Sequence, residues 1–390
     1  MRVAIVHDWL TGMRGGERCL SAFLAIYPEA DIFTLLHVPG ATSAEIDRRV
    51  KATSFLQRIP GGRRLYRHML PLYPLAVRGF DLDEYDLVIS LSHAAAKNVI
   101  IRNPSTVHIC YCFSPMRYVW DQAYEYFGAM TPVLWPVLRA LRSWDKRGAN
   151  GVRQFVAISE FVAARIRCFY GRSAAVVYPP VDTSWIRAPE ESRFSRGEAF
   201  LYAGALVPYK RPELVIEAFN HINEPLWVVG GGPLEKKLRR MANSNIHFVG
   251  QVPDAELAEY YRHCRALVFP GTEDFGMVPI ECMAAGRPVI GIYDGGLKET
   301  LLGIRPWDKK SRAECVSNEP TGVFIKPDGN MLSSTISGIY YFIDHEEAFL
   351  PEACRRQAAC FGVNQFLHGW NEEVARVLDA DVGVRSNVRR

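Results

Sequence analysis

This 390-residue sequence lacks several features that mark other classes of protein. Its nine cysteines include no Cys-x-x-Cys pair, so neither a zinc site nor a disulfide framework is indicated. It has no apolar run long enough to span a bilayer, and its first residues, MRVAIVHDWL, lack the apolar core and cleavage pattern of a signal peptide. Free thiols are typical of a reducing compartment. We therefore expect a protein of the cytoplasmic side.

A strong charge of either sign is also missing. The 46 basic and 42 acidic residues leave a net charge of only +4, so the composition gives no indication of a nucleic-acid partner. Two Asp-x-Asp pairs occur, at residues 81–83 and 379–381, but the first precedes a predicted strand and the second lies in a polar tail. A metal-holding pair would end a strand. We interpret both pairs as turn or capping acids, and we expect no metal and no cofactor.

The chain is too long for one ordinary hydrophobic core, which favours two domains. Short apolar runs alternate with helical patterns in both halves, from residues 3–7 onward and again from residue 199. This alternation predicts an α/β protein with two doubly wound, Rossmann-like domains that face each other across a cleft. The expected divisions are a first domain at 1–182, a linker at 183–198, a second domain at 199–365, and a segment at 366–390. In that last segment we expect a helix that could pack back on the first domain, followed by a polar tail.

The most informative stretch is GTEDFGMVPIECMAAGRPVIGI, residues 271–292. It predicts a loop after a buried strand, a helix that starts beside Val278 and stops at Gly286, and a further strand at 288–292. Glu281 is expected in the first helical turn, with Glu273 in the loop above it. Backbone N–H groups at the helix start point the same way, those of Gly276, Met277 and Val278.

This combination suits a sugar nucleotide. Carboxylates accept paired hydrogen bonds from vicinal hydroxyl groups, and a helix N-terminus attracts a diphosphate. The alternative is that Glu281 only favours the helix dipole and that Glu273 is a solvated loop acid.

The first predicted loop, TGMRGGE at residues 11–17, precedes a helical pattern at 17–26. It is not a G-x-G-x-x-G fingerprint, which makes a dinucleotide-dependent oxidoreductase a distant alternative. Gly15 and Gly16 either form a tight turn or let backbone N–H groups approach a phosphate or an acceptor sugar.

Residues 46–80 mix arginines with Phe, Leu, Tyr and Met and contain few acids. Such a stretch, which includes Arg63, Arg64 and Arg67, is typical of a surface that binds an anionic membrane or a lipid diphosphate. A partly buried helical excursion with solvated arginines explains the same pattern.

Several motifs resemble those of glycosyltransferase family 4, whose members have the GT-B architecture and retain anomeric configuration. They are EDFGMVPIE (273–281), VGGGP (229–233), GALVPYKRPEL (204–214) and YPPVD (178–182). HDWLTGMRGGE and YCFSPMRYVWD are similar to a branch that contains bacterial O-antigen and exopolysaccharide mannosyltransferases. The resemblance covers nearly the whole chain.

The resemblance implies a role for individual residues. Glu273 would bind hydroxyl groups of the donor sugar, Glu281 the ribose, and Lys210 the departing diphosphate, assisted by the N–H groups at 276–278. Gly231 and Gly232 would allow close approach of the nucleotide. For Lys210 the alternative is an ordinary surface lysine.

The sequence departs from the family pattern at two positions. Ala205 stands where the family usually has an arginine, for which Arg211 could substitute. Phe113 stands where many relatives have a histidine that contacts the donor sugar, although His93 and His108 are near in sequence. Arg117, in the same loop as Phe113, could contact a phosphate.

The resemblance, taken with these features, implies a retaining, metal-independent hexosyltransferase that is peripheral on the inner face of the plasma membrane. Its donor is expected to be a nucleotide sugar, GDP-mannose, and its acceptor a polyprenyl-diphosphate-linked oligosaccharide of surface polysaccharide biosynthesis. Residues 46–80 are expected to contact the anionic membrane. Two alternatives stay open: another donor, such as UDP-glucose or UDP-galactose, and a nucleotide-sugar-binding protein without turnover.

Overall fold

The computed structural model describes residues 1–390 except 63–65, 67–68, 187–196, 198, 313–318 and 389–390. The chain divides into two compact units, one formed by Met1–Pro180 with Val363–Arg390 and the other by Val181–Gly362. Most of the linker expected at 183–198 lies outside the described residues, as do Arg63, Arg64 and Arg67.

The first unit is built on a seven-stranded parallel sheet with the order β3-β2-β1-β4-β5-β6-β7. Almost every side chain of its inner strands is buried, which is why these strands read as continuous apolar runs. The strand order reverses between β1 and β4, so the loops after these strands define a binding crevice at the carboxyl edge of the sheet. The strands are β1 Val3–His7, β2 Asp31–Thr34, β3 Val50–Thr53, β4 Leu87–Ser92, β5 Val107–Cys112, β6 Gln154–Ala157 and β7 Ala174–Val176.

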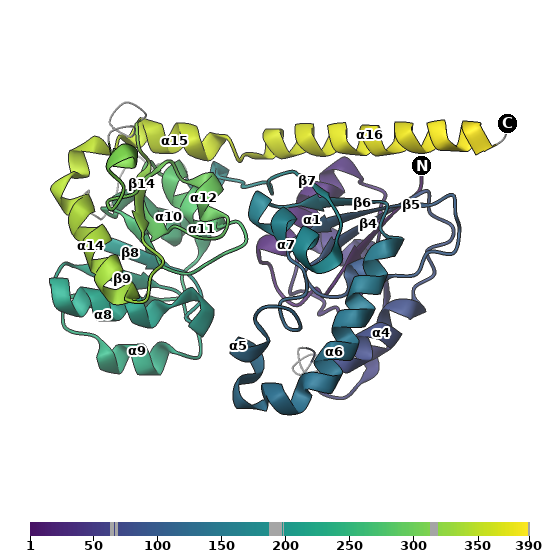
Figure 1. Cartoon of the computed structure of the whole chain (residues 1–390), viewed down its shortest axis with the longest axis horizontal. Helices are drawn as coiled ribbons and strands as arrows, with labels where there is room; N and C mark the ends of the chain where they lie inside the picture. The colour runs from purple at the N-terminus through teal and green to yellow at the C-terminus, as the bar shows by residue number, and fades with distance from the viewer. Residues whose placement is uncertain (63–65, 67–68, 187–196, 198, 313–318, 389–390) are drawn as a thin grey trace. The chain divides into compact units, whose positions relative to one another are not determined.

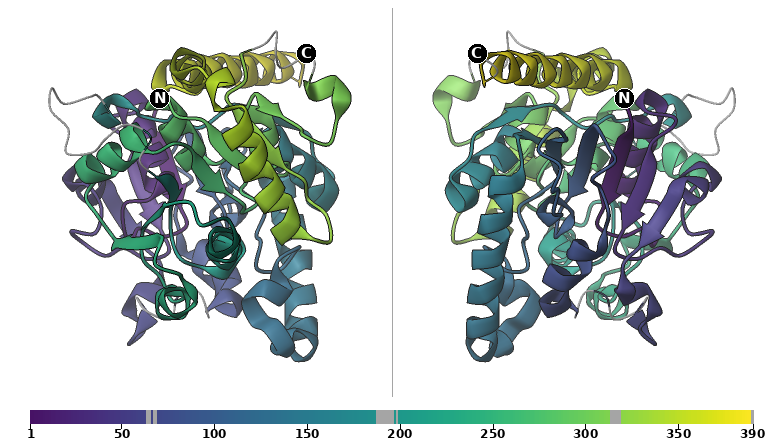
Figure 2. Two further views of the ribbon diagram at one scale, coloured as in Figure 1. Left: turned by 90° about the vertical axis from the view of Figure 1, so that its left-hand side faces the viewer. Right: turned by 90° about the vertical axis from the view of Figure 1, so that its right-hand side faces the viewer.

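Helices lie on both sides of these strands (Figures 1 and 2). The α-helices are α1 Gly15–Ile26, α2 Ala44–Arg49, α4 Tyr73–Ala76, α5 Ala123–Phe127, α6 Thr131–Gly148, α7 Glu160–Tyr170 and α16 Val363–Val388. The last of these joins the first unit through α1. Trp370 donates a hydrogen bond from its indole N–H to the Tyr27 hydroxyl at 3.1 Å, and the Trp370 and Phe366 rings meet Phe23 edge-on.

The second unit repeats the plan with a seven-stranded parallel sheet in the order β10-β9-β8-β11-β12-β14-β13. Its strands are β8 Phe200–Ala203, β9 Leu226–Val229, β10 Ile246–Gly250, β11 Leu267–Phe269, β12 Val289–Ile292, β13 Gly303–Ile304 and β14 Gly322–Ile325. Its α-helices are α8 Pro212–Ile222, α9 Glu235–Met241, α10 Asp254–His263, α11 Met277–Ala284, α12 Leu297–Thr300, α14 Met331–Asp344 and α15 Pro351–Ala359. The prediction of two doubly wound α/β domains is therefore confirmed.

Two local expectations are wrong. Helix α1 begins at Gly15 rather than Glu17, because the Glu17 carboxylate accepts a hydrogen bond from the Arg14 N–H at 3.1 Å and caps the helix two residues early. Helix α11 begins at Met277, beside Val278 as expected and after Gly276 in a left-handed conformation with φ of 90°, but Glu281 lies in its second turn rather than its first. Gly286 does adopt the left-handed conformation expected after this helix.

Among its described residues, the segment at 46–80 exposes few large apolar side chains that could insert into a membrane. Its described aromatic and apolar residues are mostly buried in the core of the first unit, with Phe55 and Leu75 as exceptions. The apolar residues of this segment therefore follow a core pattern, and the arginines are placed between them in the sequence. Within the described part of the chain, no helix is both long and apolar enough to cross a membrane.

Candidate functional site

In the second unit, Lys210 and Glu273 meet although 63 positions separate them. The Lys210 ammonium lies 3.2 Å from Oε1 of Glu273, and the two side chains are only 17% and 21% exposed. The contact is ionic rather than a well-directed hydrogen bond, because Glu273 Oε1 is buried and no donor among the described residues meets it at hydrogen-bond geometry. Burial and then the charge of Glu273 raise the pKa of the neighbouring Tyr202. A cation and a carboxylate are thus held together at the carboxyl edge of the sheet.

Close backbone packing brings these two loops together. Lys210 ends the short 3-10 helix at Pro208–Lys210 after β8, and Glu273 lies in the loop after β11. A Cβ at Gly271 would stand 2.9 Å from the Lys210 Cα, so only glycine lets the Glu273 loop pass there. On its other side, the same loop is fixed by a hydrogen bond from the Gly296 N–H to the Glu273 carbonyl at 2.9 Å.

Glu281 occupies a different environment. Its side chain is buried on α11, and the Tyr261 hydroxyl of α10 donates a hydrogen bond to Glu281 Oε2 at 2.9 Å. Burial, followed by the charge of Glu281, raises the pKa of Tyr261 well above its ordinary value, so this hydroxyl stays a donor. The carboxylate is therefore preorganised and is not a solvated acid. Sequence reasoning did not identify Tyr261, because its spacing from Glu281 carries no motif.

The other predicted donor-side residues lie at the start of α11 and in the loops after β8 and β9. Gly276, Met277 and Val278 form the start of α11, where helical N–H groups have no partner within the helix. Arg211 is exposed and has φ of 52°, an uncommon conformation for a residue with a Cβ. A Cβ at Gly232 would stand 2.5 Å from the Leu206 carbonyl, whereas one at Gly231 would meet the Gln251 side chain at 3.2 Å. The glycine run thus lets the loops after β8 and β9 pack closely.

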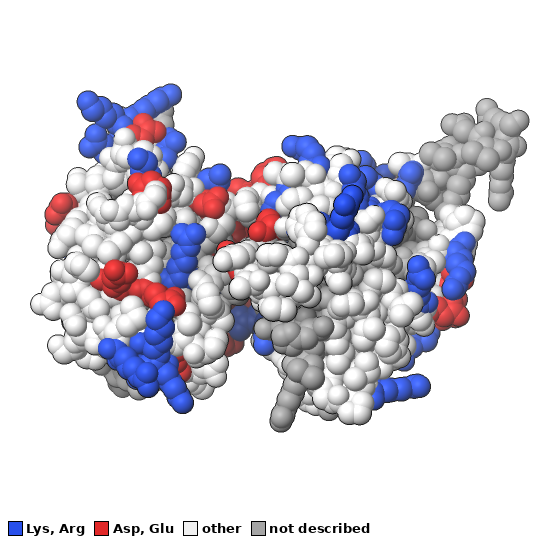
Figure 3. All heavy atoms as spheres, turned by 60° about the horizontal axis from the view of Figure 1, so that its bottom comes forward, with Lys and Arg blue, Asp and Glu red and all other residues white. Residues whose placement is uncertain are grey.

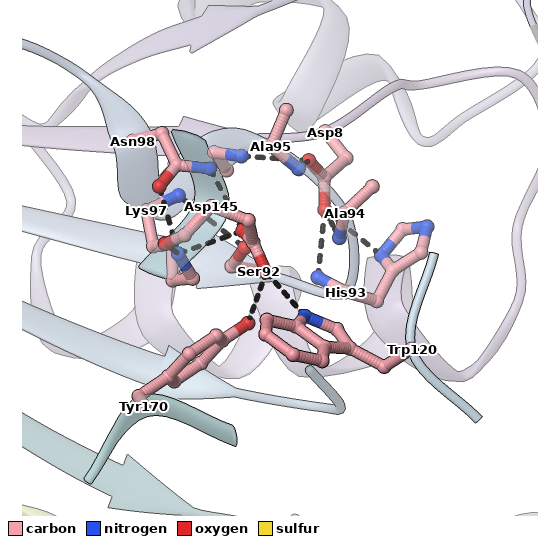
Figure 4. A network of polar contacts seen from close by, with 11 residues as sticks. Asp8, Ser92, His93, Ala94, Ala95, Lys97, Asn98, Trp120, Asp145 and Tyr170 are labelled. Carbon is pink, nitrogen blue, oxygen red and sulfur yellow. Dashed lines mark hydrogen bonds and ion pairs between the residues drawn. The ribbon is translucent and has the colours of Figure 1, made fainter. Parts of the chain in front are cut away.

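A second polar cluster lies at the carboxyl edge of the first sheet. Asp8, directly after β1, is completely buried, and its two carboxylate oxygens accept four backbone N–H groups, from residues 93–96, at 2.6–2.9 Å. The same carboxylate lies 3.2 Å from Nδ1 of His93, which is 28% exposed (Figure 4). The carboxylate therefore fixes both the loop after β4 and the orientation of the His93 ring.

His7, the last residue of β1, is also buried in this cluster. Its Nδ1 lies 3.0 Å from the Trp9 carbonyl, which can only accept, so Nδ1 carries the proton. Burial and then the proximity of His93 lower the pKa of His7 to about 4, which keeps the ring neutral. A Cβ at Gly16 would lie 3.4 Å from His7 Nε2 and 3.6 Å from the Phe113 ring, so the start of α1 packs directly on both rings. His7 and Asp8 were missed, although a polar pair at the end of a buried strand was the available signal.

Arg117 and His108 each form hydrogen bonds with neighbouring groups of the first unit. Nε of Arg117 donates to the Ser114 hydroxyl at 3.2 Å, and Arg165 donates to the same hydroxyl at 2.7 Å. His108 is buried between the Ser90 hydroxyl at 2.9 Å and the Gly151 carbonyl at 3.3 Å, so it does not reach the place of the missing histidine at 113. Of the two alternatives, only His93 lies beside Phe113, with ring centroids 6.4 Å apart.

A buried ion pair stands behind this edge of the sheet. Lys97 Nζ lies 2.8 Å from Asp145 Oδ1, and the two side chains are 2% and 0% exposed. The other carboxylate oxygen of Asp145 accepts hydrogen bonds from the Trp120 indole and the Tyr170 hydroxyl, each at 2.8 Å (Figure 4). Because these charges are fully paired, the network supports structure rather than chemistry.

The described residues contain no group of three or more His, Cys, Asp or Glu side chains arranged to hold a metal ion. The Asp83 N–H donates to Asp81 at 3.3 Å, and Asp83 accepts the Arg102 N–H at 2.9 Å, as expected of turn acids. In the second pair Asp379 is exposed on α16, while the side chain of Asp381 lies outside the described residues. The eight described cysteines are free thiols.

Comparison with known families agrees with this geometry. Residues 15–185 match the model named Glycosyltransferase Family 4, and residues 186–302 match the model named Glycosyl transferases group 1. The chain belongs to glycosyltransferase family 4.

Curated relatives of this family 4 member share parts of the chain. O-antigen chain mannosyltransferase C of Escherichia coli is 36% identical over 25% of this chain and 28% of its own length. The GDP-mannose-dependent alpha-(1-6)-phosphatidylinositol monomannoside mannosyltransferase of Mycolicibacterium smegmatis is 27% identical over 43% and 51%. An uncharacterized glycosyltransferase of Methanocaldococcus jannaschii is 29% identical over 41% and 46%. The chain thus matches about half, or less, of the length of these relatives.

Solved structures share the GT-B fold along nearly the whole chain. Anabaena HepE in complex with UDP superposes with a TM-score of 0.68 at 15% identity, covering 97% of this chain and all of that one. Sucrose-phosphate synthase from Thermosynechococcus elongatus gives 0.69 at 17%, with the same coverage. WaaG, a glycosyltransferase of lipopolysaccharide biosynthesis, gives 0.60 at 14%, covering 92% and 95%.

Proposed function

We propose that this family 4 member transfers mannose from GDP-mannose, with retention of configuration, to a polyprenyl-diphosphate-linked oligosaccharide of bacterial surface polysaccharide biosynthesis. The observation that carries the proposal is the ion pair of Lys210 and Glu273 beside the start of α11. The mannose donor is supported by the two mannosyltransferases among the relatives, one of them named for GDP-mannose.

Each donor-side residue has a role that follows from its chemistry. Glu273 accepts hydrogen bonds from hexose hydroxyl groups, and the buried carboxylate of Glu281 accepts them from the ribose. The bond between the sugar and the diphosphate breaks with negative charge building on the departing oxygen. Lys210 and the N–H groups of residues 276–278 stabilise that charge, and Arg211 adds a second cation in place of the arginine missing at 205. The departing phosphate then takes the proton of the acceptor hydroxyl on the same face of the sugar.

The first unit receives the acceptor in this proposal. Gly15 and Gly16 present the N-terminus of α1, and Arg117 supplies a cation near the same edge of the sheet. His93 is oriented by Asp8 and lies next to Phe113, so it supplies the polar ring that position 113 lacks. The protein works on the inner face of the plasma membrane, where the exposed arginines of 46–80 contact anionic lipid, for example Arg58 and Arg78.

A UDP-sugar is the second candidate for the donor, because HepE was solved with UDP-glucose. A protein that binds a nucleotide sugar without turnover is the third, since Ala205 and Phe113 depart from the family pattern. Incubation of the full chain with each donor and a short-chain polyprenyl-diphosphate saccharide, in the presence of a chelator, separates the three. Mass spectrometry should detect hexose addition from GDP-mannose alone. Addition from a UDP-sugar would replace the donor, and no addition from any donor would contradict the enzyme.

A further inference from the structure

The most apolar exposed surface of the described chain lies in residues 124–137, here called the apolar tip. Of the fifteen large apolar side chains that are exposed among the described residues, six fall within these 14 positions. Val133 and Tyr124 are 70% and 72% exposed. The remaining members are Tyr126 at 40%, Met130 at 55%, Trp135 at 48% and Val137 at 41%. A concentration of this kind marks a surface that meets a partner.

The tip is held rigidly from its base. It comprises α5, the turn that follows, and the first two turns of α6. Farther along α6, Leu138 and Leu141 pack into the core and Asp145 joins the buried network with Lys97. Arg142 donates hydrogen bonds to the backbone of residues 119 and 120, and its guanidinium lies 4.7 Å from the centre of the Trp135 ring. The exposed side chains therefore project from a fixed support.

The charges around the tip favour an anionic partner. The tip itself contains one acid, the exposed Glu125, and the sequence contains none between residues 126 and 144. Beyond Val137, the exposed positions of α6 include the basic residues Arg139, Lys146 and Arg147. Figure 3, in which the lower side of Figure 1 comes forward, shows a broad uncharged surface on the first unit, bordered by basic side chains and by a few acidic ones.

We propose that the apolar tip inserts into the headgroup region of an anionic lipid bilayer. The first two turns of α6 rise by about 10 Å, a length comparable to the depth of about 5–10 Å to which interfacial apolar side chains are buried. Tyr124, Tyr126 and Trp135 are the aromatic types that favour this region, and the basic residues of the following turns then meet lipid phosphates. The inference rests on the proposed function, in which a lipid-linked acceptor requires contact with the bilayer, and it gives that contact an apolar anchor that 46–80 lacks.

The test is sedimentation of the full chain with vesicles of phosphatidylglycerol and phosphatidylcholine. The wild type should bind, and the double variant Val133→Asp, Val137→Asp should have a partition coefficient lower on the order of tenfold or more, because two apolar side chains no longer leave water. Leu302→Asp with Tyr340→Asp is the matched control, since these residues are 48% and 47% exposed in the second unit. The control should bind like the wild type, and the thermal unfolding of all three proteins should agree.

Calorimetric titration with GDP-mannose on the same proteins separates this inference from the proposed function. Donor binding by the wild type without vesicle binding would overturn the insertion and leave the function intact. Vesicle binding lost in the tip variant but kept in the control supports the insertion, whether or not GDP-mannose is the donor. A dimer that the tip variant dissociates, with no vesicle binding by either protein, would assign the surface to a second copy and overturn the proposal.

Discussion

Lys210 is the residue on which the proposed chemistry depends most. It is held 3.2 Å from Glu273 at the carboxyl edge of the second sheet, where a departing diphosphate would be stabilised. A Cβ at Gly271 would stand 2.9 Å from the Lys210 Cα, so the lysine loop packs directly against the start of the Glu273 loop. In the proposed mechanism, this packing links the position of the lysine to the recognition of the donor sugar by Glu273.

We predict that Lys210→Ala lowers kcat by about 10²- to 10³-fold with a smaller change in KM, because the lost charge acts mainly on the leaving group. Initial rates of hexose transfer measure this effect. Lys237→Ala is the matched control, since Lys237 is 62% exposed and only contacts Glu213 at 3.6 Å. Wild-type kcat in the Lys210 variant would show that another group stabilises the diphosphate.

At the scale of elements, α6 illustrates how a buried ion pair fixes a projecting helix. At the base of the helix, the Asp145 carboxylate pairs with Lys97 and accepts hydrogen bonds from Trp120 and Tyr170. The other end of the helix exposes the apolar tip. The network joins residues 48 positions apart, so its stability decides whether the tip has a fixed support.

Lys97→Met should reduce the free energy of unfolding by about 3–5 kcal/mol, because it leaves the Asp145 carboxylate buried without its cation. Urea unfolding at neutral pH measures the loss. Arg102→Met removes an exposed pair with Asp83 and should cost less than about 1 kcal/mol. Equal losses in the two variants would contradict a structural role for the buried pair.

The elements were largely predictable from sequence, whereas their partners were not. Strands such as β1 and β5 are buried on both faces, so their apolar runs are unambiguous. Glu281 lies one turn later in α11 than expected, because the helix begins directly after the left-handed Gly276. For 46–80 the sequence left two interpretations open, and its apolar residues follow the one that places them in the core. Tyr261 at Glu281 and the four N–H donors at Asp8 arise from residues distant in sequence, which no local spacing encodes.

At the scale of the whole molecule, two histidines are kept neutral inside the first unit. Burial lowers the pKa of His7 and of His108 to about 4 from an ordinary value of 6.5. The unfolded chain therefore binds protons between pH 6.5 and 4 that the folded chain does not, so stability rises with pH over this window and levels off above it.

We expect the free energy of unfolding to fall on acidification from pH 6.5, by at most about 1.4 kcal/mol per pH unit for each of these histidines. Urea unfolding between pH 4 and 8 gives the slope. His7→Gln should reduce the slope of unfolding free energy against pH by the contribution of one histidine. His368→Gln should leave the slope unchanged, because the side chain of His368 is 77% exposed. A flat profile in the wild type would contradict neutral burial of both rings.

The central claim is that the second unit binds a guanosine-diphosphate sugar without a metal ion. Isothermal titration of the purified full chain with GDP-mannose, UDP-glucose and UDP-galactose in a chelator tests it most directly. The account predicts binding of GDP-mannose in preference to both UDP-sugars, and slow release of free mannose detectable by mass spectrometry. Preference for a UDP-sugar, or binding that appears only when a divalent ion is added, would contradict it.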